Sequence, residues 1–462
     1  MKIVNCLFSI ATILPGSMFA QAVKSFPNVI YIMADDLGIG DLGCYGQRQI
    51  KTPNIDNIAR HGMKFMQHYA GSTVSAPSRC ALLTGKHMGH AAVRGNKKVL
   101  GSDGLAYDTP LPKEEVTVAD IFKKRGYMTA CIGKWGLGGP GTEGMPDKHG
   151  FDYFYGYLGQ KFAHSYYPDF LHENDKRIEL NGKVYSHDLM LKKSLDFIER
   201  YKQNSFFLYY TPTIPHADLD IIKEQQQEYE GMFCETPFTD RGGYKQQATP
   251  RATYAAMVTY LDRSVGLIIE KLKELGLYDN TIVIFTSDNG VHAEGGHDPY
   301  FFDSNGPFRG YKRDLYEGGI RTPFVIQWPK IIPAGVVTDH VSAFWDFLPT
   351  ISDLLQVNNA SNICDGISYL PTLTKKDKQQ KKHSCIYYEF FEGGGKQSIM
   401  TSDGWKLIRL QVAVPEKTYE ELYNLRIDPA EIANLIEQYP EVATRLRNMI
   451  AGQRTENIDF HF

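Results

Sequence analysis

Two adjacent pairs of oxygen-donor residues in this chain have the chemistry of a metal site. Asp35-Asp36 and Asp288-Asn289 each follow a short apolar, strand-like run. Carboxylate and amide oxygens are the hard donors that Ca²⁺ and Mg²⁺ prefer. Three carboxylates gathered in one place would repel one another strongly unless a cation held them. The pattern predicts a divalent-cation site; the alternative is that these residues only cap turns.

A lysine and a histidine follow two further strand-like runs. Lys134 comes after residues 127–132, and His216 comes after residues 206–210, directly behind Pro215. In open α/β sheets, ligands bind outside the carboxyl ends of the strands. We therefore expect the two oxygen-donor pairs, the lysine and the histidine to share one edge of a sheet.

Strand-like and helical segments alternate along most of the chain, and they must position these side chains. Short apolar runs predict buried strands, and apolar residues at helical spacing predict amphipathic helices. We expect strands at residues 28–34, 127–132, 206–210, 281–286 and 324–328, and helices at residues 116–125, 184–201 and 254–275. This order predicts an α/β fold with a mostly parallel sheet and helices on both faces.

The composition changes after about residue 375, where a solvated charge run (375–382) begins. Three strands of a small antiparallel sheet and a closing helix are expected beyond it, at residues 385–391, 396–401, 405–410 and 439–449. We therefore expect a large α/β domain at residues 23–375 and a small C-terminal α+β domain at residues 376–462.

The N-terminus has the pattern of a secretory signal peptide. Lys2 precedes a mostly apolar stretch (3–14) and a small-x-small site at Ala20-Gln21-Ala22. The apolar stretch is shorter than the ~20 residues of an ordinary membrane span, and no second run of that length follows. We expect residues 1–22 to be removed and the protein to be exported without a membrane span; the alternative is a buried N-terminal helix or strand.

Overall composition excludes some partners. The 462 residues carry 50 Lys+Arg against 53 Asp+Glu, a formal net charge of -3. Without a basic surplus to neutralise phosphates, no nucleic-acid partner is expected. The length exceeds the roughly 250–300 residues at which single cores stop growing, which also predicts two domains. Of the seven cysteines, Cys6 would leave with the signal peptide, and no disulfide framework is indicated.

The segment from Ser75 to Lys86 (SAPSRCALLTGK) carries a specific motif. It resembles the sulfatase family of the alkaline-phosphatase-like superfamily, whose signature is Cys or Ser, then x-Pro-Ser-Arg, then x-x-Leu-x-Thr-Gly. The resemblance covers nearly the whole mature chain and includes residues 35–36, 133–135, 215–216, 287–290, 309–312, 317–321, 421–425 and 428–429. It implies an alkaline-phosphatase-like fold and cleavage of sulfate esters.

The resemblance also implies a role for each residue that matches the family's motifs. Ser75 would be oxidised to formylglycine, whose hydrated aldehyde is the nucleophile. One Ca²⁺, or alternatively Mg²⁺, would be held by Asp35, Asp36, modified Ser75, Asp288 and Asn289. Arg79 would hold the nucleophile, Lys134 and Lys312 would bind sulfate oxygens, and His216 would protonate the leaving oxygen.

One position departs from the family's pattern. Gly136 stands in GKWGLG (133–138) where the family usually has a His that is thought to assist breakdown of the sulfated intermediate. His164, in the segment AHSYYP, is our candidate to replace it. The alternative is that His164 contacts substrate or is structural.

The substrate is expected to be a sulfated carbohydrate, with galactose or N-acetylgalactosamine sulfate at a chain end as our preference. His297 and Arg309 from a polar loop region, and Glu392 and Gln397 from the small domain, are candidate sugar contacts. Polar loop residues of this kind are as often structural.

The Ser form of the motif resembles bacterial enzymes that a radical, iron–sulfur maturase oxidises, often in anaerobes. Together with the signal peptide, it suggests the periplasm of a Gram-negative bacterium. Two alternatives stay open. The protein could be a phosphodiesterase or phosphonate monoester hydrolase of the same superfamily, or an inactive protein that binds sulfated glycans if Ser75 is never oxidised.

Overall fold

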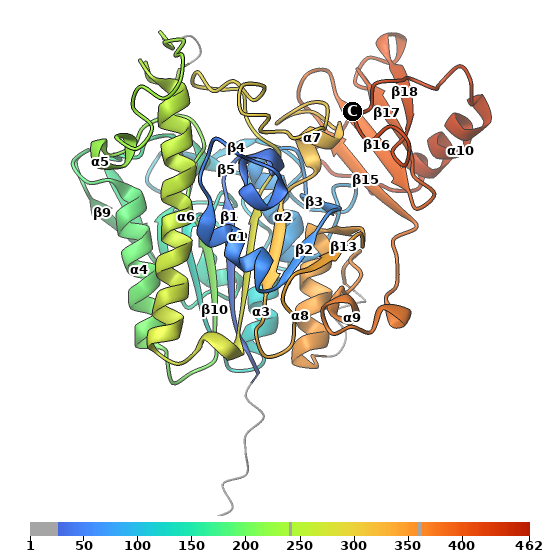
Figure 1. The fold of residues 1–462 in the computed structure, drawn as a ribbon. Helices are drawn as coiled ribbons and strands as arrows, with labels where there is room; N and C mark the ends of the chain where they lie inside the picture. The colour runs from blue at the N-terminus through green and yellow to red at the C-terminus, as the bar shows by residue number, and fades with distance from the viewer. Residues whose placement is uncertain (1–25, 240–242, 358–362) are drawn as a thin grey trace, which may run out of the picture.

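A ten-stranded sheet forms the centre of the large domain in the described part of the chain (Figure 1). The computed structural model describes residues 26–239, 243–357 and 363–462, so the predicted signal peptide (1–22) lies outside the described residues. The strand order is β13 (Val336–Thr338), β2 (Met63–Phe65), β12 (Phe324–Gln327), β11 (Thr281–Ser287), β1 (Asn28–Ala34), β10 (Phe206–Thr211), β6 (Met128–Lys134), β7 (Tyr153–Tyr157), β8 (Phe170–Glu173) and β9 (Lys176–Glu179).

The middle of this sheet is parallel and fully buried. β11, β1, β10, β6 and β7 run in the same direction, whereas β12 and β8 add to the two sides in antiparallel orientation. β1 is buried at every position, as expected for a strand covered on both faces. The predicted mostly parallel sheet is therefore confirmed.

Helices cover both faces, and alternate residues of β1 show the division. Val29, Tyr31 and Met33 pack in one apolar core, whereas Ile30 and Ile32 pack in the other. The first core lies against α2 (Ser75–Thr84), α3 (Val118–Lys123) and α8 (Phe347–Leu355), and the second against α1 (Pro53–Arg60), α4 (Ser186–Arg200) and α6 (Pro250–Glu274). The strand period of two thus places the two helical layers.

Shorter elements connect these layers. The short helices are α5 (Lys223–Gln226), α7 (Glu317–Ile320) and α9 (Leu370–Leu373), and the short strands pair as β3 (His68–Tyr69) with β14 (Ser342–Ala343) and β4 (Lys98–Leu100) with β5 (Ala106–Asp108). The expected domain boundary at residues 375/376 falls between α9 and the next strand.

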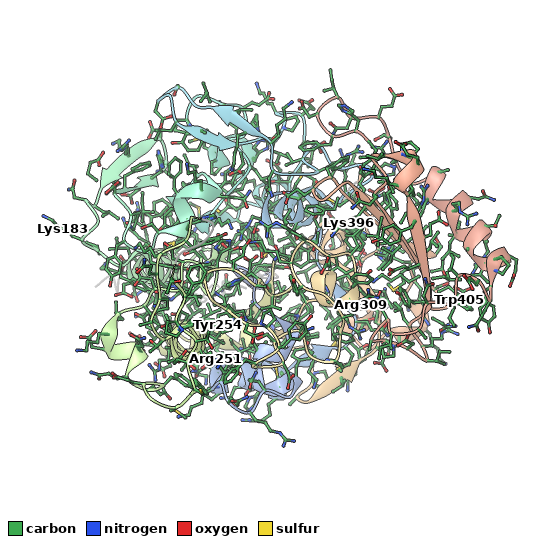
Figure 2. The ribbon with its side chains drawn as sticks, turned by 90° about the horizontal axis from the view of Figure 1, so that it is seen from above. Lys183, Arg251, Tyr254, Arg309, Lys396 and Trp405 are labelled. Atoms are coloured by element: carbon green, nitrogen blue, oxygen red, sulfur yellow. The ribbon has the colours of Figure 1, made fainter. Side chains whose placement is uncertain are left out.

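The small domain is an antiparallel four-stranded sheet with one helix. It consists of β15 (Cys385–Phe390), β16 (Lys396–Thr401), β17 (Trp405–Leu410), β18 (Tyr419–Asn424) and α10 (Pro440–Ala451). Tyr387 and Ile399 face α10, whereas Ile386 and Tyr388 join the core of the large domain. Seen from above (Figure 2), Trp405 lies on the outer side of this domain and Lys396 toward the large domain. β18 is the strand that the sequence patterns did not predict.

Two expectations about the whole chain can be compared with the described residues. Cys44, Cys80, Cys131, Cys234, Cys364 and Cys385 are all free thiols. Within the described part of the chain, no helix combines the length and the apolarity needed to cross a membrane.

Candidate active site

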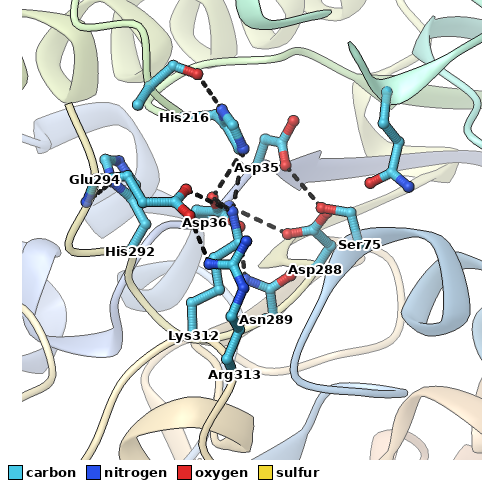
Figure 3. Close-up of polar contacts among 12 residues, drawn as sticks. Asp35, Asp36, Ser75, His216, Asp288, Asn289, His292, Glu294, Lys312 and Arg313 are labelled. Atoms are coloured by element: carbon cyan, nitrogen blue, oxygen red, sulfur yellow. Dashed lines mark hydrogen bonds and ion pairs between the residues drawn. The ribbon is translucent and has the colours of Figure 1, made fainter. Parts of the chain in front are cut away.

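The carboxyl ends of four neighbouring parallel strands bring the predicted residues together (Figure 3). Ala34 of β1 pairs with Ser287 of β11, so the residues that follow each strand lie side by side. On the other side, Thr211 of β10 pairs with Gly133 of β6, which places Lys134 at the same edge. The expected convergence at one sheet edge is therefore observed.

The oxygen donors of the two pairs are completely buried and contact one another. The backbone N–H of Asp36 donates to Asp288 Oδ1 at 3.1 Å, and Asn289 Nδ2 donates to Asp36 Oδ1 at 2.6 Å. Asp36 has a φ of +60°, a left-handed conformation that is uncommon outside glycine. Because adjacent side chains of an extended strand point to opposite sides, this turn helps Asp35 and Asp36 to reach the same site.

Ser75 is the first residue of α2 and is buried between an acid and an amine. Its Oγ donates to Asp35 Oδ1 at 3.1 Å and accepts from Lys134 Nζ at 3.2 Å. Lys134 Nζ also donates to both oxygens of Asp35, at 2.9 and 2.7 Å. The positive end of the helix dipole adds to the field at Ser75, an arrangement that favours anions.

Arg79 lies one helical turn after Ser75 and is held from two sides. Its guanidinium donates to Asp288 Oδ2 and to the backbone oxygen of Lys134, both at 2.8 Å, and it is fully buried. The spacing of four residues places Ser75 and Arg79 on the same face of α2. Arg79 is therefore a positive charge that two hydrogen bonds fix on the Ser75 face of α2.

The crowded carboxylates shift one another's protonation. Burial and the neighbouring Asp35 carboxylate raise the pKa of Asp288 to about 6. Burial alone would also raise the pKa of Asp36, but Lys312, His292 and Lys134 together outweigh it, so that this pKa lies below its ordinary value. The raised pKa favours the protonated, neutral form of Asp288. This is the effect expected when like charges lie close together without a compensating cation.

His216 and Lys312 meet above Asp36. His216 Nε2 lies 3.2 Å from Asp36 Oδ2 and 3.2 Å from Lys312 Nζ, while its Nδ1–H donates to the backbone oxygen of Ala217. Burial, and then the positive charge of Lys312, lowers the pKa of His216 well below its ordinary value. The contact with Ala217 places the Nδ1 proton away from the site and leaves Nε2 facing it.

The structure places His164 beside His216, and its replacement of the family's histidine stays a prediction. Its ring stacks on His216 with 4.7 Å between centroids, and burial lowers its pKa to about 4. A Cβ added at Gly136 would instead lie 3.2 Å from Cγ of Gln160. Both residues belong to the 3₁₀ turn Gln160–His164, but Gln160 is the one that lies over Gly136.

Gln160 is held firmly in this place. Its backbone N–H and its side-chain Nε2 donate to the two carboxylate oxygens of Asp108 at 2.8 and 3.0 Å, and Nε2 also lies 3.2 Å from Asn96 Oδ1. The sequence analysis considered only a histidine for the role missing at Gly136, and it did not identify Gln160. Its contact with Gly136 joins two loops that are distant in sequence.

All four candidate sugar contacts form side-chain contacts within the protein. His297 is buried and stacks on Tyr254 at 3.6 Å between centroids. Arg309 donates to the Tyr423 hydroxyl at 2.9 Å and lies over the ring of Tyr316. Their side chains are thus committed to packing and to contacts with the small domain.

Gln397 was expected to contact the sugar, and this expectation was wrong because its side chain lies on the other face of β16. Gln397 lies two residues before Ile399 in β16, so its side chain shares the face that packs against α10. Its amide is bonded to the Tyr387 hydroxyl and to Arg409, at 3.0 and 2.9 Å. It therefore does not close the site from the small domain.

Glu392, the fourth candidate, does reach the large domain. Its carboxylate accepts from Arg313 Nε at 3.1 Å and from Asn96 Nδ2 at 3.0 Å. Arg313 and its second partner, Glu294, were not predicted as site residues. The only available signals were that Arg313 follows Lys312 directly and that Glu294 begins the polar loop considered for specificity.

A second group of metal-ligand types lies elsewhere, at His87, His90 and Asp365. His90 Nδ1 is 2.8 Å from Asp365 Oδ1, and the backbone N–H of Gly89 donates to His87 Nδ1 at 3.1 Å. The Nε2 of neutral His87 therefore carries the proton and offers no lone pair. This arrangement favours hydrogen bonds that connect the His87–His90 segment to Asp365 over a metal site.

Known proteins resemble the chain over most of its length. The family model described as Sulfatase matches residues 27–357, and the model described as N-sulphoglucosamine sulphohydrolase, C-terminal, matches residues 306–456. Human N-acetylgalactosamine-6-sulfatase is 31% identical over 384 residues, which cover 77% of this chain and 67% of that protein. Human arylsulfatase A is 29% identical over 472 residues, which cover 90% and 84%, respectively.

Solved structures share the fold. The crystal structure of Ps i-CgsB in complex with k-i-k-neocarrahexaose has a TM-score of 0.77 and 28% identity, with 93% of each chain covered. A structure concerned with glycosaminoglycan metabolism by Bacteroides thetaiotaomicron has a TM-score of 0.75 and 26% identity, covering 92% of this chain and 99% of that one. A phosphonate monoester hydrolase of Agrobacterium radiobacter (TM-score 0.65, 19% identity) shares the fold alone.

The match to the sulfatase model spans well over half of the chain and contains all four strand ends that form the site. The predicted alkaline-phosphatase-like α/β architecture with a small antiparallel C-terminal domain is confirmed. This chain therefore belongs to the sulfatase family and is a sulfuric ester hydrolase.

Proposed function

We propose that this protein hydrolyses sulfate esters on carbohydrates with a nucleophile made from Ser75 and a bound Ca²⁺. The observation that carries the proposal is the position of the Ser75 hydroxyl between Asp35 and Lys134. An unmodified serine needs a neighbouring base, but Asp35 is already paired with Lys134. Oxidation of Ser75 to formylglycine would supply a geminal diol with one hydroxyl made more acidic by the bound cation. That hydroxyl would give up its proton and attack sulfur as the sugar oxygen leaves, and the second hydroxyl would then lose its proton, expel sulfate and restore the aldehyde.

The donor set fits a hard divalent cation. Asn289 Oδ1 is buried and has no hydrogen-bond partner within the described residues, and the pKa of Asp288 is raised to about 6. Both features would be relieved by a cation held by Asp35, Asp36, Asp288 and Asn289. Ca²⁺ suits an all-protein oxygen site better than Mg²⁺, which usually keeps several waters. When bound, the ion would polarise a sulfate oxygen.

The remaining side chains have roles that follow from their contacts. Arg79, bonded from two sides, offsets carboxylate charge beneath the nucleophile. Lys134 donates to Asp35 and Lys312 donates to Asp36, and both ammonium groups would bind the sulfate oxygens. His216 Nε2, which faces the site, would deliver the proton to the leaving oxygen once the bound anionic ester had raised the pKa of the ring enough to protonate it.

We further propose a galactose or N-acetylgalactosamine sulfate at a chain end as substrate. Support comes from the similarity to N-acetylgalactosamine-6-sulfatases and to a structure in complex with a neocarrahexaose. A panel of positionally sulfated monosaccharides tests this directly. Turnover of gluco-configured sulfates together with resistance of every galacto-configured one would overturn the proposal.

Maturation and location are part of the same proposal. The Ser-type motif supports oxidation of Ser75 by an anaerobic radical maturase, and the N-terminal pattern supports export to the periplasm of a Gram-negative bacterium. Mass spectrometry of the Ser75 peptide from the native host should show a loss of two hydrogens and a chain that begins near Val23. Unmodified Ser75 from that source would contradict the mechanism.

Turnover of matched esters tests the reaction itself. With protein matured in a host that has the radical maturase, sulfate should be released from a sulfate ester much faster than phosphate from the corresponding phosphate ester. Protein from a host without the maturase is the control and should be nearly inactive. Faster phosphate release would favour the phosphonate and phosphodiester branch of the superfamily.

A further inference from the structure

The backbone at Arg313 is strained and held in place from both sides. Its φ is +76°, in the left-handed region that non-glycine residues seldom adopt. The Arg313 N–H donates to the backbone oxygen of Thr73 at 3.1 Å, and its carbonyl accepts from Lys396 Nζ at 2.7 Å. Segments from both domains thus stabilise a conformation that the residue alone would disfavour.

The strain lets two adjacent cations reach the same carboxylate. In an extended segment Lys312 and Arg313 would point to opposite sides. Here Lys312 Nζ donates to one oxygen of Glu294 at 2.8 Å, and Arg313 donates from its guanidinium to the other (Figure 3). The inferred sulfate-binding lysine and Arg313 therefore share an anchor beside the catalytic edge.

A second carboxylate completes this arrangement from the small domain. Glu392 accepts from Arg313 Nε at 3.1 Å, so the guanidinium lies between Glu294 and Glu392. The side chains of Arg313 and Glu392 are 43% and 41% exposed, whereas Arg79 and Lys134 are at most 1% exposed. The Glu294 side chain is 16% exposed, so Glu294, Arg313 and Glu392, hereafter the clamp, are more accessible to an incoming sugar than Arg79, Lys134 or Lys312.

The balance of charges around the site suits the binding of one anion. Counting the clamp, four cations face five carboxylates, namely Arg79, Lys134, Lys312 and Arg313 against Asp35, Asp36, Asp288, Glu294 and Glu392. A divalent cation would turn this single negative excess into a single positive one. One sulfate monoester would then neutralise the site, and no unpaired cation in this set remains for a second anion.

We propose that the clamp selects a monosulfated sugar whose neighbouring groups are uncharged hydroxyls, and disfavours a uronic acid or a second sulfate beside the scissile ester. The inference rests on the proposed function and deepens it. Carboxylates accept strong, charge-assisted hydrogen bonds from sugar hydroxyls. The same carboxylates repel a uronate or a second sulfate on the sugar. That anionic group would lose its hydration without gaining a cationic partner, and a cost of this kind is an effective source of specificity.

Binding to unmatured protein tests the clamp without depending on the nucleophile. Isothermal titration calorimetry would compare N-acetylgalactosamine 6-sulfate with a monosulfated disaccharide that carries a uronate next to the sulfated sugar, in Ca²⁺-containing buffer. Wild-type protein should bind the neutral-flanked ligand at least about tenfold more tightly. Equal affinities, or tighter binding of the uronate ligand, would overturn the proposal.

Glu392→Gln is the informative variant because Glu392 touches none of the expected metal ligands. It should weaken the neutral ligand about tenfold and reduce the discrimination against the uronate ligand, since one carboxylate acceptor is lost. Glu437→Gln, an exposed residue before α10, makes the same charge change away from the site and should behave as wild type. Unchanged discrimination in Glu392→Gln with an unchanged melting temperature would refute the role of the clamp.

The two proposals fail in different ways. If matured wild-type protein releases sulfate but does not distinguish the ligands, the proposed function stands and the clamp inference falls. If no sulfated sugar binds and none is turned over, the proposed function itself falls, and the clamp inference with it.

Discussion

Lys134 Nζ forms hydrogen bonds with both oxygens of Asp35, at 2.9 and 2.7 Å, and the two side chains are 1% and 0% exposed. The same ammonium lies 3.2 Å from Ser75 Oγ. The pair thus connects the strand-end acids to Ser75. Removing one member of such a buried pair leaves the other charge uncompensated.

Lys134→Met should therefore reduce both stability and activity. We expect the free energy of unfolding of calcium-free protein to fall by about 3 kcal/mol, measured by urea denaturation, and turnover of the matured enzyme to be nearly lost. Lys202→Met is the control, because Lys202 pairs with Glu199 in an exposed ion pair and should cost less than about 1 kcal/mol. Equal effects of the two variants would contradict the importance of the buried pair.

Calcium should stabilise the folded protein through the strand-end acids. At a Ca²⁺ concentration of about one hundred times the dissociation constant, the free energy of unfolding should rise by about 2.7 kcal/mol. Asp288→Asn should reduce this increase, whereas Asp279→Asn, at the opposite end of β11, should preserve it. Thermal melts with EGTA and with added Ca²⁺ measure the effect. A calcium response that is identical in all three proteins would place the ion elsewhere.

Introducing the family's histidine at Gly136 should destabilise the protein. Gly136 has a φ of +77°, and a Cβ there would contact Gln160 Cγ at 3.2 Å. Gly136→His should cost about 1–3 kcal/mol of stability through strain and overpacking. In the double variant with Gln160→Ala the contact is removed, so the two changes should be non-additive. Strict additivity in denaturant titrations would show that the two side chains do not compete for this space.

His383 should make stability depend on pH outside the active site. Its Nε2 lies 2.8 and 3.0 Å from the oxygens of Asp346. Burial alone would lower the pKa of His383, but the carboxylate more than offsets it and raises this pKa above 6.5. The nearby His87 and His340 have lowered pKa values and stay neutral near pH 7.

The direction of the pH effect follows from this raised value. The folded state favours protonated His383, so its stabilisation is complete below about pH 6.5 and is lost as the pH rises through the folded pKa. Urea denaturation between about pH 6 and 8 should show a steeper decline for wild type than for His383→Gln. His61→Gln, at an exposed position, should retain the wild-type slope. Parallel slopes for wild type and His383→Gln would exclude the ion pair as the cause.

The sequence by itself determined the four central parallel strands and the residues at their carboxyl ends. The runs that became β1, β6, β10 and β11 are mostly apolar because both faces of these strands are buried, and such runs are recognisable without a partner. Since parallel strands end at the same edge, the placement of Asp35 and Asp288 followed from the pattern alone. The Ser75 motif then indicated the family.

Only the tertiary structure decided which other side chains complete the site. The contact of Gln160 with Gly136 depends on how a 3₁₀ turn packs across a neighbouring loop. Gln397 was misplaced because the face of β16 that meets α10 is set by strand register. Arg313 reaches Glu294 and Glu392 through a left-handed backbone that contacts from two domains stabilise. Such long-range contacts leave no periodic pattern in the chain, so they become visible only when the segments meet in space.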